Sequence, residues 1–352
     1  MDRLRIKDYD LELYSAGMPH FSGNFTRDSI ISAILMKNSK MLKDQLIFCS
    51  LNQGKNKNSI TGEELGKIFH ELPGVKIRNL NTFYNACDTT ALYLIGHKFY
   101  YQFTKDNSLI LNQKENIKKA LEYILSHLRN GFFYEDPKFC DADKFALKVT
   151  YWKDSSIINR ENGEPIYPVV YTLAHIENMA AVRFAAEILE SKELLDIAED
   201  MKSKALDLLF SNGFVIARDE KGDIKGITSD ILHSLFYFEL GDLNKKQLQK
   251  IIEASKKIET PFGYRVLDKK LSESVDDKYH SDSIWPFEQA IIHFGAIKFG
   301  LKDIKDVSFK IFNLLDTDPE IFILEGDSAK KGGCDPQLWT IAAKKYFKSI
   351  RE

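Results

Sequence analysis

Two carboxyl groups in separate segments have neighbours suited to acid and base chemistry. Asp154 directly follows Trp152 and Lys153, and Glu320 follows a proline near the end of the chain. An indole beside a carboxyl group offers an apolar face to a sugar ring and partly desolvates the acid, which raises its pKa. Glycoside hydrolysis uses one carboxyl group to protonate the leaving oxygen and another to activate water from the opposite face. Asp154 and Glu320 are therefore our candidate acid and base, although an isolated Trp and Asp also fit an ordinary loop turn.

Polar residues near two expected helix starts are candidates for binding the hydroxyls of a sugar. Arg27 and Asp28 are adjacent, and each can form two hydrogen bonds to neighbouring hydroxyls. His70, Glu71 and Asp88 lie in or after the next long segment and are candidate wall residues of the same site. Taken singly, these residues also fit an aspartate helix cap, a surface arginine and ordinary loop positions. Spacing alone leaves both interpretations open.

Aromatic and polar residues are dense in two later segments that lead into apolar helices. The first segment runs over 279–289 and the second over 332–339. We expect both to line the same site, and the candidates are His280, Trp285, Glu288, Gln337 and Trp339. Asp282, Glu288 and Glu325 are the alternatives to Glu320 as the base.

Helical periodicity marks two kinds of segment that alternate along the chain. The first kind is unusually apolar or aromatic and predicts buried helices. It covers about 28–38, 83–104, 168–190, 228–240, 282–300 and 335–349. The second kind has a narrower apolar stripe with more Lys and Glu and predicts half-exposed helices. It covers about 41–52, 113–129, 192–211, 244–257 and 303–316.

The connections alternate in length as the helices alternate in polarity. Each apolar segment passes to its charged partner through a short turn, and each charged segment returns through a long connection. This pattern predicts an all-α fold, an (α/α)6 barrel of helical hairpins formed by residues 1–352 as one domain, with a pocket at the end where the long loops gather. Because only five outer helices are visible, residues 3–14 supply the twelfth helix or the ring is incomplete. An α-solenoid is the structural alternative, but no repeat of fixed period supports it.

The composition narrows the class of protein. Of the 352 residues 44% are hydrophobic, and 49 basic and 51 acidic side chains give a formal net charge of -2. This balance argues against binding to nucleic acid or to an anionic membrane. The charged N-terminus does not resemble a signal peptide, and no apolar run approaches the roughly 20 residues of a membrane span. The four cysteines have no CxxC spacing, so we expect a soluble, cytoplasmic protein.

Taken in order, seven motifs resemble the amylo-α-1,6-glucosidase domain of glycogen debranching enzymes and their bacterial and archaeal relatives, with a more distant similarity to glucoamylases. They cover 23–28, 66–71, 88–90, 152–155, 279–286, 319–322 and 334–339, and thus nearly the whole chain. The resemblance implies a six-hairpin glycosidase barrel without metal or organic cofactor. It also implies that Asp154 is the general acid and Glu320 the general base.

The resemblance further assigns the remaining site residues and shows where this chain departs from the family. It implies that Arg27 and Asp28 hold hydroxyls of the terminal sugar, and that Trp152, His280 and Trp285 line the same subsite. Relatives commonly have a Glu-x-Gln pair where this chain has Leu173 and His175, and a Gly where it has Asp282. These departures leave specificity for glycogen in doubt. A disaccharide or a glucosyl conjugate of a polar acid is an open alternative.

The leading hypothesis is an inverting, exo-acting hydrolase that removes a terminal α-linked glucosyl unit, with a carbohydrate as its partner molecule. A sugar phosphorylase or epimerase on the same barrel is a second hypothesis, because one fold hosts several chemistries. A catalytically inert barrel that binds a glycan or a protein is the third. The presence of both carboxyl groups favours an enzyme, since an inert barrel has no chemical need for either. The sequence does not determine the oligomeric state.

Overall fold

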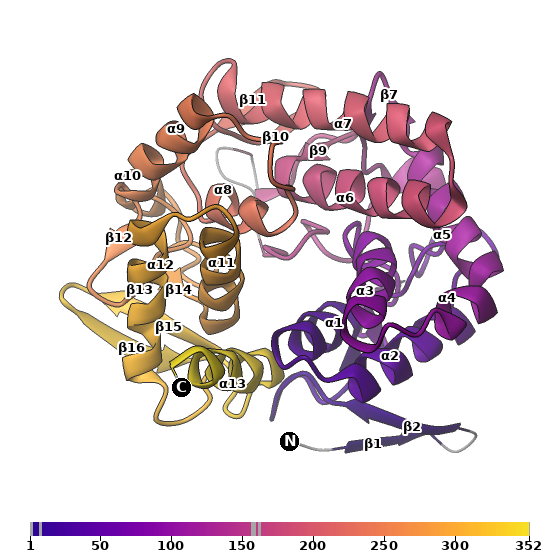
Figure 1. Cartoon of the computed structure of the whole chain (residues 1–352), viewed down its shortest axis with the longest axis horizontal. Helices are drawn as coiled ribbons and strands as arrows, with labels where there is room; N and C mark the ends of the chain where they lie inside the picture. Colours follow the sequence, from indigo (N-terminus) through magenta and orange to yellow (C-terminus); the bar gives the residue numbers. More distant parts are fainter. Residues whose placement is uncertain (1–2, 7–8, 156–159, 161–162, 352) are drawn as a thin grey trace.

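An inner ring of helices surrounds the axis of the molecule (Figure 1). The computed structural model describes residues 3–6, 9–155, 160 and 163–351. Within this part, the inner ring consists of α1 (Thr26–Leu35), α3 (Thr89–Thr104), α6 (Thr172–Leu189), α8 (Asp230–His233) with the 3-10 turn η3 (Ser234–Phe236), α11 (Pro286–Lys298) and α13 (Leu338–Arg351). Each helix packs against the next in chain order, and α13 packs against α1. The chain therefore closes into a helical barrel.

A second layer of helices lies outside the inner ring (Figure 1). It consists of α2 (Ser39–Leu51), the short α4 (Ser108–Asn112), α5 (Lys114–Ser126), α7 (Lys192–Phe210), α9 (Lys245–Ser255) and α12 (Lys302–Phe309) with the 3-10 turn η4 (Lys310–Leu314). Every residue of α1 is buried, whereas α5 and α9 bury only one stripe. The predicted alternation of apolar inner and charged outer helices is confirmed for α1, α6 and α11, which are buried on most sides, whereas the inner helix α13 exposes one face near its C-terminus.

Four inner helices are several residues shorter than predicted, and one of them, α6, begins at Thr172 rather than at residue 168. The predicted helix over 228–240 ends after η3, where the ammonium of Lys298 donates hydrogen bonds to the carbonyl oxygens of Phe236 and Phe238 at 2.7 and 2.6 Å. These carbonyls are therefore satisfied without further helical turns. Residues 83–88 precede α3 as an irregular connection, and residues 283–284 form the strand β14 before α11. The helix boundaries predicted for these segments were wrong by several residues.

Residues 3–6 and 9–14 form a β-hairpin, so of the two alternatives, a helix over residues 3–14 or an incomplete ring, the first was wrong. Its strands are β1 (Arg3–Ile6) and β2 (Tyr9–Tyr14), and β2 packs against α2. Leu13 is buried and Leu11 is half-buried, so apolar residues alternate with polar ones along β2. A period of two is typical of a half-buried strand and is incompatible with the stripe of a helix.

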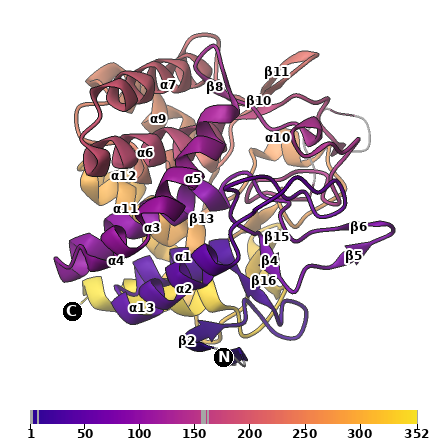
Figure 2. The same ribbon diagram turned by 90° about the vertical axis from the view of Figure 1, so that its right-hand side faces the viewer.

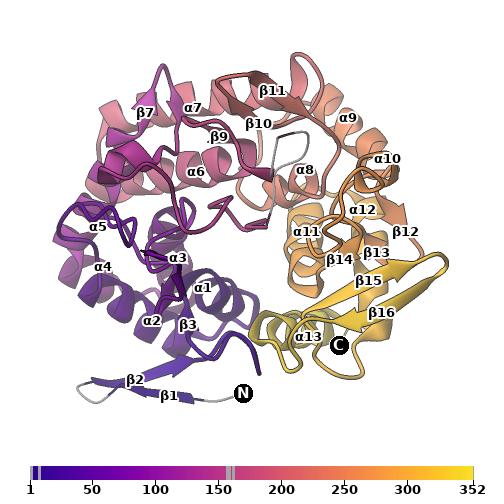
Figure 3. The same cartoon turned by 180° about the vertical axis from the view of Figure 1, so that it is seen from behind.

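The long connections contain short antiparallel strands, which the prediction of an all-α fold did not include. The strands are β3 (Asn24–Phe25), β4 (Glu71–Leu72), β5 (Lys76–Ile77), β6 (Leu80–Asn81), β7 (Leu128–Arg129), β8 (Phe132–Phe133), β9 (Val170–Tyr171), β10 (Val215–Asp219), β11 (Gly222–Lys225), β12 (Glu259–Thr260), β13 (Gly263–Tyr264), β14 (Ser283–Ile284), β15 (Ile321–Glu325) and β16 (Ser328–Gly332). Most of them gather at one end of the ring, seen from the side in Figure 2 and face-on in Figure 3. The connections also contain the 3-10 turn η1 (Pro137–Cys140) and the short helix α10 (Lys269–Ser272).

The remaining expectations concern membrane spans and cysteines. In the part of the chain that the structure describes, no helix is both long and apolar enough to cross a membrane. All four cysteines are buried and carry free thiols. Burial raises the pKa of the Cys49 thiol to about 12, so this thiol stays protonated at neutral pH.

Candidate active site

A small pocket opens at the end of the ring where the long connections gather. Its volume is about 80 Å³. Ten of the residues predicted for the site line it: Arg27, Asp28, His70, Trp152, Asp154, His280, Trp285, Glu320, Gln337 and Trp339. Phe21, Phe25 and Tyr279 complete the lining. Residues far apart in the chain thus meet in one pocket, which contains both candidate catalytic carboxyl groups.

The guanidinium of Arg27 contacts both Asp88 and the candidate acid. Arg27 lies in the first turn of α1 and donates two hydrogen bonds to Asp88, from Nε at 2.9 Å and from Nη2 at 3.0 Å. The same guanidinium lies 3.7 Å from Oδ2 of Asp154. Asp88 does not line the pocket, because both of its carboxylate oxygens face Arg27. It fixes the orientation of Arg27 through a bidentate pair, a geometry that specifies both partners.

Asp154 has the electrostatic environment of a general acid. Its side chain is 29% exposed to solvent and lines the pocket. Desolvation raises its pKa to about 7, and the negative charges of Asp88, Glu71 and Glu320 act in the same direction against the opposing charge of Arg27. Desolvation acts this way because it disfavours the charged form of a carboxyl group. At neutral pH a substantial fraction of Asp154 is therefore protonated.

Glu320 is held by hydrogen bonds to both of its carboxylate oxygens. Tyr279 donates to Oε1 at 2.5 Å, and the backbone N–H of Cys334 donates to Oε2 at 3.0 Å. The amide of Gln337 lies 3.4 Å from Oε1. Burial raises the pKa of Glu320, while these three donors oppose the rise because they stabilise the ionised form.

Gly333 allows the backbone to approach Glu320. Its φ is +71°, in the left-handed region that favours glycine. A Cβ atom at this position would lie 2.2 Å from Oε2 of Glu320. Glycine is thus required here for both backbone conformation and space.

Asp28 places a third carboxyl group in the pocket. It is almost fully buried, and desolvation raises its pKa well above the ordinary value, with Glu320 adding to the rise and Arg27 opposing it. Gln337 lies between the two acidic groups, with its amide nitrogen 3.5 Å from Asp28 and 3.4 Å from Glu320. One amide side chain thus connects the start of α1 to the candidate base.

Aromatic rings form the other walls of the pocket. The imidazole of His280 stacks on Trp285 at 4.9 Å with an interplanar angle of 4°, and Trp152 meets both rings edge-on. Trp339 stacks on Phe287 behind the wall. Burial lowers the pKa of His280 and of His70, with nearby positive charges adding to the effect. Both imidazoles are therefore neutral at pH 7 and can serve as uncharged hydrogen-bonding groups.

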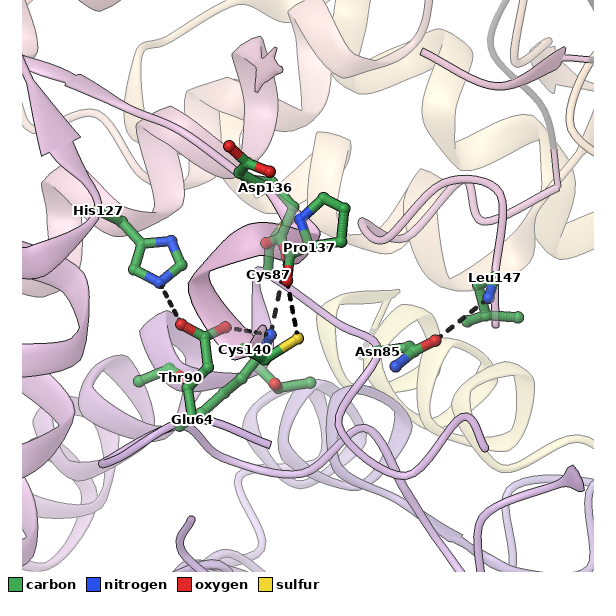
Figure 4. Close-up of polar contacts among 12 residues, drawn as sticks. Glu64, Asn85, Cys87, Thr90, His127, Asp136, Pro137, Cys140 and Leu147 are labelled. Atoms are coloured by element: carbon green, nitrogen blue, oxygen red, sulfur yellow. Dashed lines mark hydrogen bonds and ion pairs between the residues drawn. The ribbon is translucent and has the colours of Figure 1, made fainter. Parts of the chain in front are cut away.

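The segment that leads to Asp154 is anchored before it reaches the pocket. Asn85 Oδ1 accepts hydrogen bonds from the backbone N–H groups of Ala146 at 2.7 Å and Leu147 at 3.2 Å. Figure 4 shows the bond to Leu147. The N–H of Cys87 donates to the carbonyl of Thr150 at 2.8 Å. Beyond the acid, the hydroxyl of Ser155 pairs with Nδ1 of His280 at 2.8 Å. The loop is thus tied to the entrance of α3 on one side and to the pocket wall on the other.

A buried charged cluster supports the same region (Figure 4). Glu64 Oε2 lies 2.8 Å from His127 Nε2, and Glu64 Oε1 lies 3.1 Å from the ammonium of Lys67, which is fully buried. Glu135 lies 3.7 Å from the same ammonium. Burial opposes ionisation of Glu64, yet Lys67 and His127 lower its pKa to about 2. The cluster joins the connection after α2 to α5 and to the start of the connection that carries Asp154.

Two further predicted residues do not line the pocket, in addition to Asp88. Glu71 accepts a hydrogen bond from Thr82 and contributes only through its charge, which raises the pKa of Asp154. Glu288 is fully buried and lies 3.6 Å from Nδ1 of His233. Of the alternative bases, Asp282 pairs with Arg265 at 2.8 Å and Glu325 is exposed at the end of β15. Neither lines the pocket, so Glu320 is the one candidate base among them that does.

The sequence prediction did not select Phe21, Phe25 and Tyr279 as site residues. Tyr279 stood within a motif that was recognised, but a tyrosine in an aromatic segment carries no signal that separates a pocket residue from a core residue. Phe25 lies in β3, and strands of two residues have no recognisable periodicity from which the direction of a side chain can be predicted.

Solved structures share this fold at low sequence identity. An uncharacterized conserved protein of Thermus thermophilus superposes with a TM-score of 0.69 at 10% identity, over 95% of each chain. The GH63 mannosylglycerate hydrolase of the same organism, in complex with glucose, gives a TM-score of 0.68 at 10% identity, again over 95% of each chain. The GH78 rhamnosidase of Bacillus sp. GL1 gives 0.60 at 13% identity, over 94% of this chain and 32% of that one.

These similarities show that the chain has a helical barrel of the kind found in glycoside hydrolases. No protein-family model matches the sequence, and no curated protein matches it.

Proposed function

We propose that the protein is an inverting, exo-acting glycoside hydrolase that removes a terminal α-linked glucosyl unit from an oligosaccharide, a glucan or a small glucosyl conjugate. The observation that carries this proposal is that Asp154 and Glu320 line one pocket in different environments. Asp154 has a pKa near 7 and can hold a proton, while Glu320 accepts three hydrogen bonds that favour its ionised form. Two carboxyl groups with separated roles are what the reaction requires.

The mechanism assigns one proton transfer to each carboxyl group. Asp154 donates its proton to the glycosidic oxygen as the bond between that oxygen and the anomeric carbon breaks. Glu320 accepts a proton from a water molecule that attacks the anomeric carbon from the opposite face. The sugar is released with inverted configuration, Asp154 is left ionised and Glu320 protonated. Proton exchange with solvent restores both groups.

The size and lining of the pocket support a substrate whose terminal sugar alone is enclosed. Its volume of about 80 Å³ is far below the roughly 300–1,000 Å³ of pockets for drug-sized ligands. The aromatic wall offers an apolar face to a sugar ring, and Arg27, Asp28 and Gln337 offer polar groups to its hydroxyls. Glucose as the sugar rests on the motif resemblance and on the glucose complex of the mannosylglycerate hydrolase.

The fold is proposed in finer detail as an (α/α)6 barrel in which one chain forms one catalytic domain. The order of the inner helices around the axis supports this assignment. The β1–β2 hairpin then occupies the place of the twelfth helix. It closes the ring beside α2 without adding a residue to the pocket.

The test is release of glucose from a panel of α-linked disaccharides, oligosaccharides and glucosyl conjugates at neutral pH, with and without inorganic phosphate. We expect one linkage class to release free glucose without phosphate, and Asp154→Asn to abolish that release. Release that requires phosphate would instead identify a phosphorylase. If no substrate is cleaved and sugars still bind, as measured by calorimetry, the inert-binder hypothesis replaces this one.

A further inference from the structure

Asp230 binds the three residues that directly precede the candidate acid. It is the first residue of α8 in the inner ring, and it is 7% exposed. Its Oδ1 accepts the indole N–H of Trp152 at 2.8 Å, and its Oδ2 accepts the hydroxyl of Tyr151 at 3.2 Å. The ammonium of Lys153 lies 3.0 Å from Oδ1. One carboxylate thus contacts three consecutive side chains from another part of the ring.

We propose that Asp230 is the positioning residue that holds the general acid in place, by fixing the side chains of residues 151–153 immediately before Asp154. The inference rests on the function proposed above. Asp230 does not line the pocket and does not touch the substrate there. It acts through its neighbours, because a change in the path of residues 151–153 moves the carboxyl group attached to the next residue.

The side chain of Asp230 does not act as a cap of its own helix. Ser229 is the residue before α8, and no side-chain cap hydrogen bond is found there. Within the described residues, the hydrogen bonds of the Asp230 carboxylate go to the loop that carries the acid. An aspartate at a helix start commonly satisfies backbone N–H groups, so this orientation away from the helix is what distinguishes Asp230 from an ordinary cap.

The charge of Asp230 has a second effect, through Lys153. The ammonium of Lys153 is 6% exposed and lies 4.9 Å from the ring centre of Trp152. In the described part of the chain, Asp230 is the carboxylate that pairs with it. Without this partner, the positive charge of Lys153 would stay uncompensated on the residue that precedes Asp154 in the chain, and a positive charge that moves closer to a carboxyl group lowers its pKa. Loss of Asp230 should therefore ionise the acid at a lower pH.

Other charged groups also face Asp154, Lys153 and Asp230, and they are the same in the wild type and in the Asp230 variant. Asp154 faces Arg27, Asp88, Glu71 and Glu320. Lys153 also faces His280, and Asp230 also faces Glu177. Replacing Asp230 should shift the pKa of Asp154, and removing the charge of Lys153 as well should reverse that shift. Such a pattern assigns the shift to the pair of Asp230 and Lys153.

The experiment compares Asp230→Asn with Asp242→Asn. Asp242 forms an ion pair with Arg183 at 2.7 Å, and its side chain is 9% exposed, as is that of Asp230. It lies in the turn before α9, away from the pocket. Both changes remove the charge of one shielded carboxylate. Of the two residues, only Asp230 contacts the loop that carries the acid. The melting temperature of each variant reports any general loss of stability.

For Asp230→Asn we expect kcat to fall by at least about 10-fold with little change in KM, because misplacing a catalytic group mainly affects the transition state. We also expect the alkaline limb of the kcat/KM profile to move to lower pH by roughly half a unit or more. Adding Lys153→Met to Asp230→Asn should move that limb back. If the kcat of Asp230→Asn stays at the wild-type value, or if its alkaline limb stays in place, Asp230 does not position the acid and the inference is overturned.

A measurement without substrate separates this inference from the proposed function. The titration of the Asp154 carboxyl carbon can be followed by carbon-13 NMR, assigned by its loss in Asp154→Asn. A lower pKa of Asp154 in Asp230→Asn than in Asp242→Asn supports the inference even if no sugar is hydrolysed. Equal pKa values in the two variants overturn it even if the wild-type protein is an active hydrolase.

Discussion

The hydroxyl of Tyr279 donates a hydrogen bond of 2.5 Å to Oε1 of Glu320. The two residues belong to different connections, one before α11 and one before α13, so this bond joins two neighbouring sectors of the barrel. The other oxygen of Glu320 is held by the backbone of Cys334. A carboxylate fixed at both oxygens is prevented from rotating, which keeps the base in one orientation toward the pocket.

The first prediction is a bell-shaped dependence of kcat/KM on pH, with an alkaline limb near pH 7. Asp154 must be protonated, so activity is present below its pKa of about 7 and is lost above it. Glu320 must be ionised, so activity is lost as the pH falls through its pKa. In Tyr279→Phe the ionised form of Glu320 loses a donor and its pKa rises further, so the acid limb should move to higher pH.

The control for that change is Tyr84→Phe, which removes the hydrogen bond from Tyr84 to the carbonyl of Asn52, outside the pocket. Its pH profile should match that of the wild type. An acid limb that stays in place in Tyr279→Phe would show that Tyr279 does not tune the base.

The second prediction concerns the choice of catalytic carboxyl groups. Asp154→Asn and Glu320→Gln should each lower kcat by roughly 10²–10⁴-fold, the usual contribution of a general acid or base. Asp282→Asn and Glu325→Gln are the matched controls, since neither residue lines the pocket. Both should keep near-wild-type kcat, and the folded state of all four variants can be checked by circular dichroism. Loss of activity in Glu325→Gln combined with an active Glu320→Gln would assign the base to Glu325.

The third prediction tests the close approach of Gly333 to the base. In Gly333→Ala the new methyl group would meet Oε2 of Glu320, so the carboxylate must move and kcat should fall by about 100-fold. Gly326→Ala is the control, because Gly326 also has a positive φ, +60°, but no atom lies within 4 Å of the added Cβ. Both changes should cost about 1–2 kcal/mol of stability from backbone strain. Equal kcat values in the two variants would show that the contact with Glu320 is unimportant.

The fourth prediction concerns stability, and its subject is the buried cluster around Lys67. Lys67→Met leaves Glu64 and Glu135 without their buried cation and should lower the free energy of unfolding by about 3–5 kcal/mol. Lys118→Met removes an exposed ion pair with Glu115 and should leave that free energy nearly unchanged. Urea denaturation of the two variants makes the comparison. A Lys67→Met protein as stable as Lys118→Met would show that the cluster does not hold the loop in place.

The layered arrangement of helices was predictable from sequence because burial on all sides and burial on one side leave different compositions. The two-residue strands were not, since such short segments carry little periodicity and are stabilised by the elements they pack against. The β1–β2 hairpin was missed although β2 alternates apolar and polar residues, because a ring of six helical hairpins leaves one more helix to be supplied there. The end of the helix at Phe236 was also hidden, because it depends on the ammonium of Lys298, which comes from a helix far along the chain.

The residues of the pocket were largely predictable because they stand within the long connections or at the starts of inner helices. The direction of each side chain was not. Asp88 and Glu71 stand near the pocket, but Asp88 faces Arg27 and Glu71 accepts a hydrogen bond from Thr82. Asp230 carries no motif at all, and its role is visible only when α8 and the loop before Asp154 are seen in contact.

The most direct test of the account is the anomeric configuration of the sugar at the moment of release. Proton NMR of the first product from the best α-glucosyl substrate should show the β-anomer before mutarotation, because water activated by Glu320 attacks from the face opposite the leaving group. Asp154→Asn and Glu320→Gln should show no product on the same timescale. Initial release of the α-anomer would mean retention, and would contradict the assignment of Asp154 and Glu320 as an acid and base that act from opposite faces.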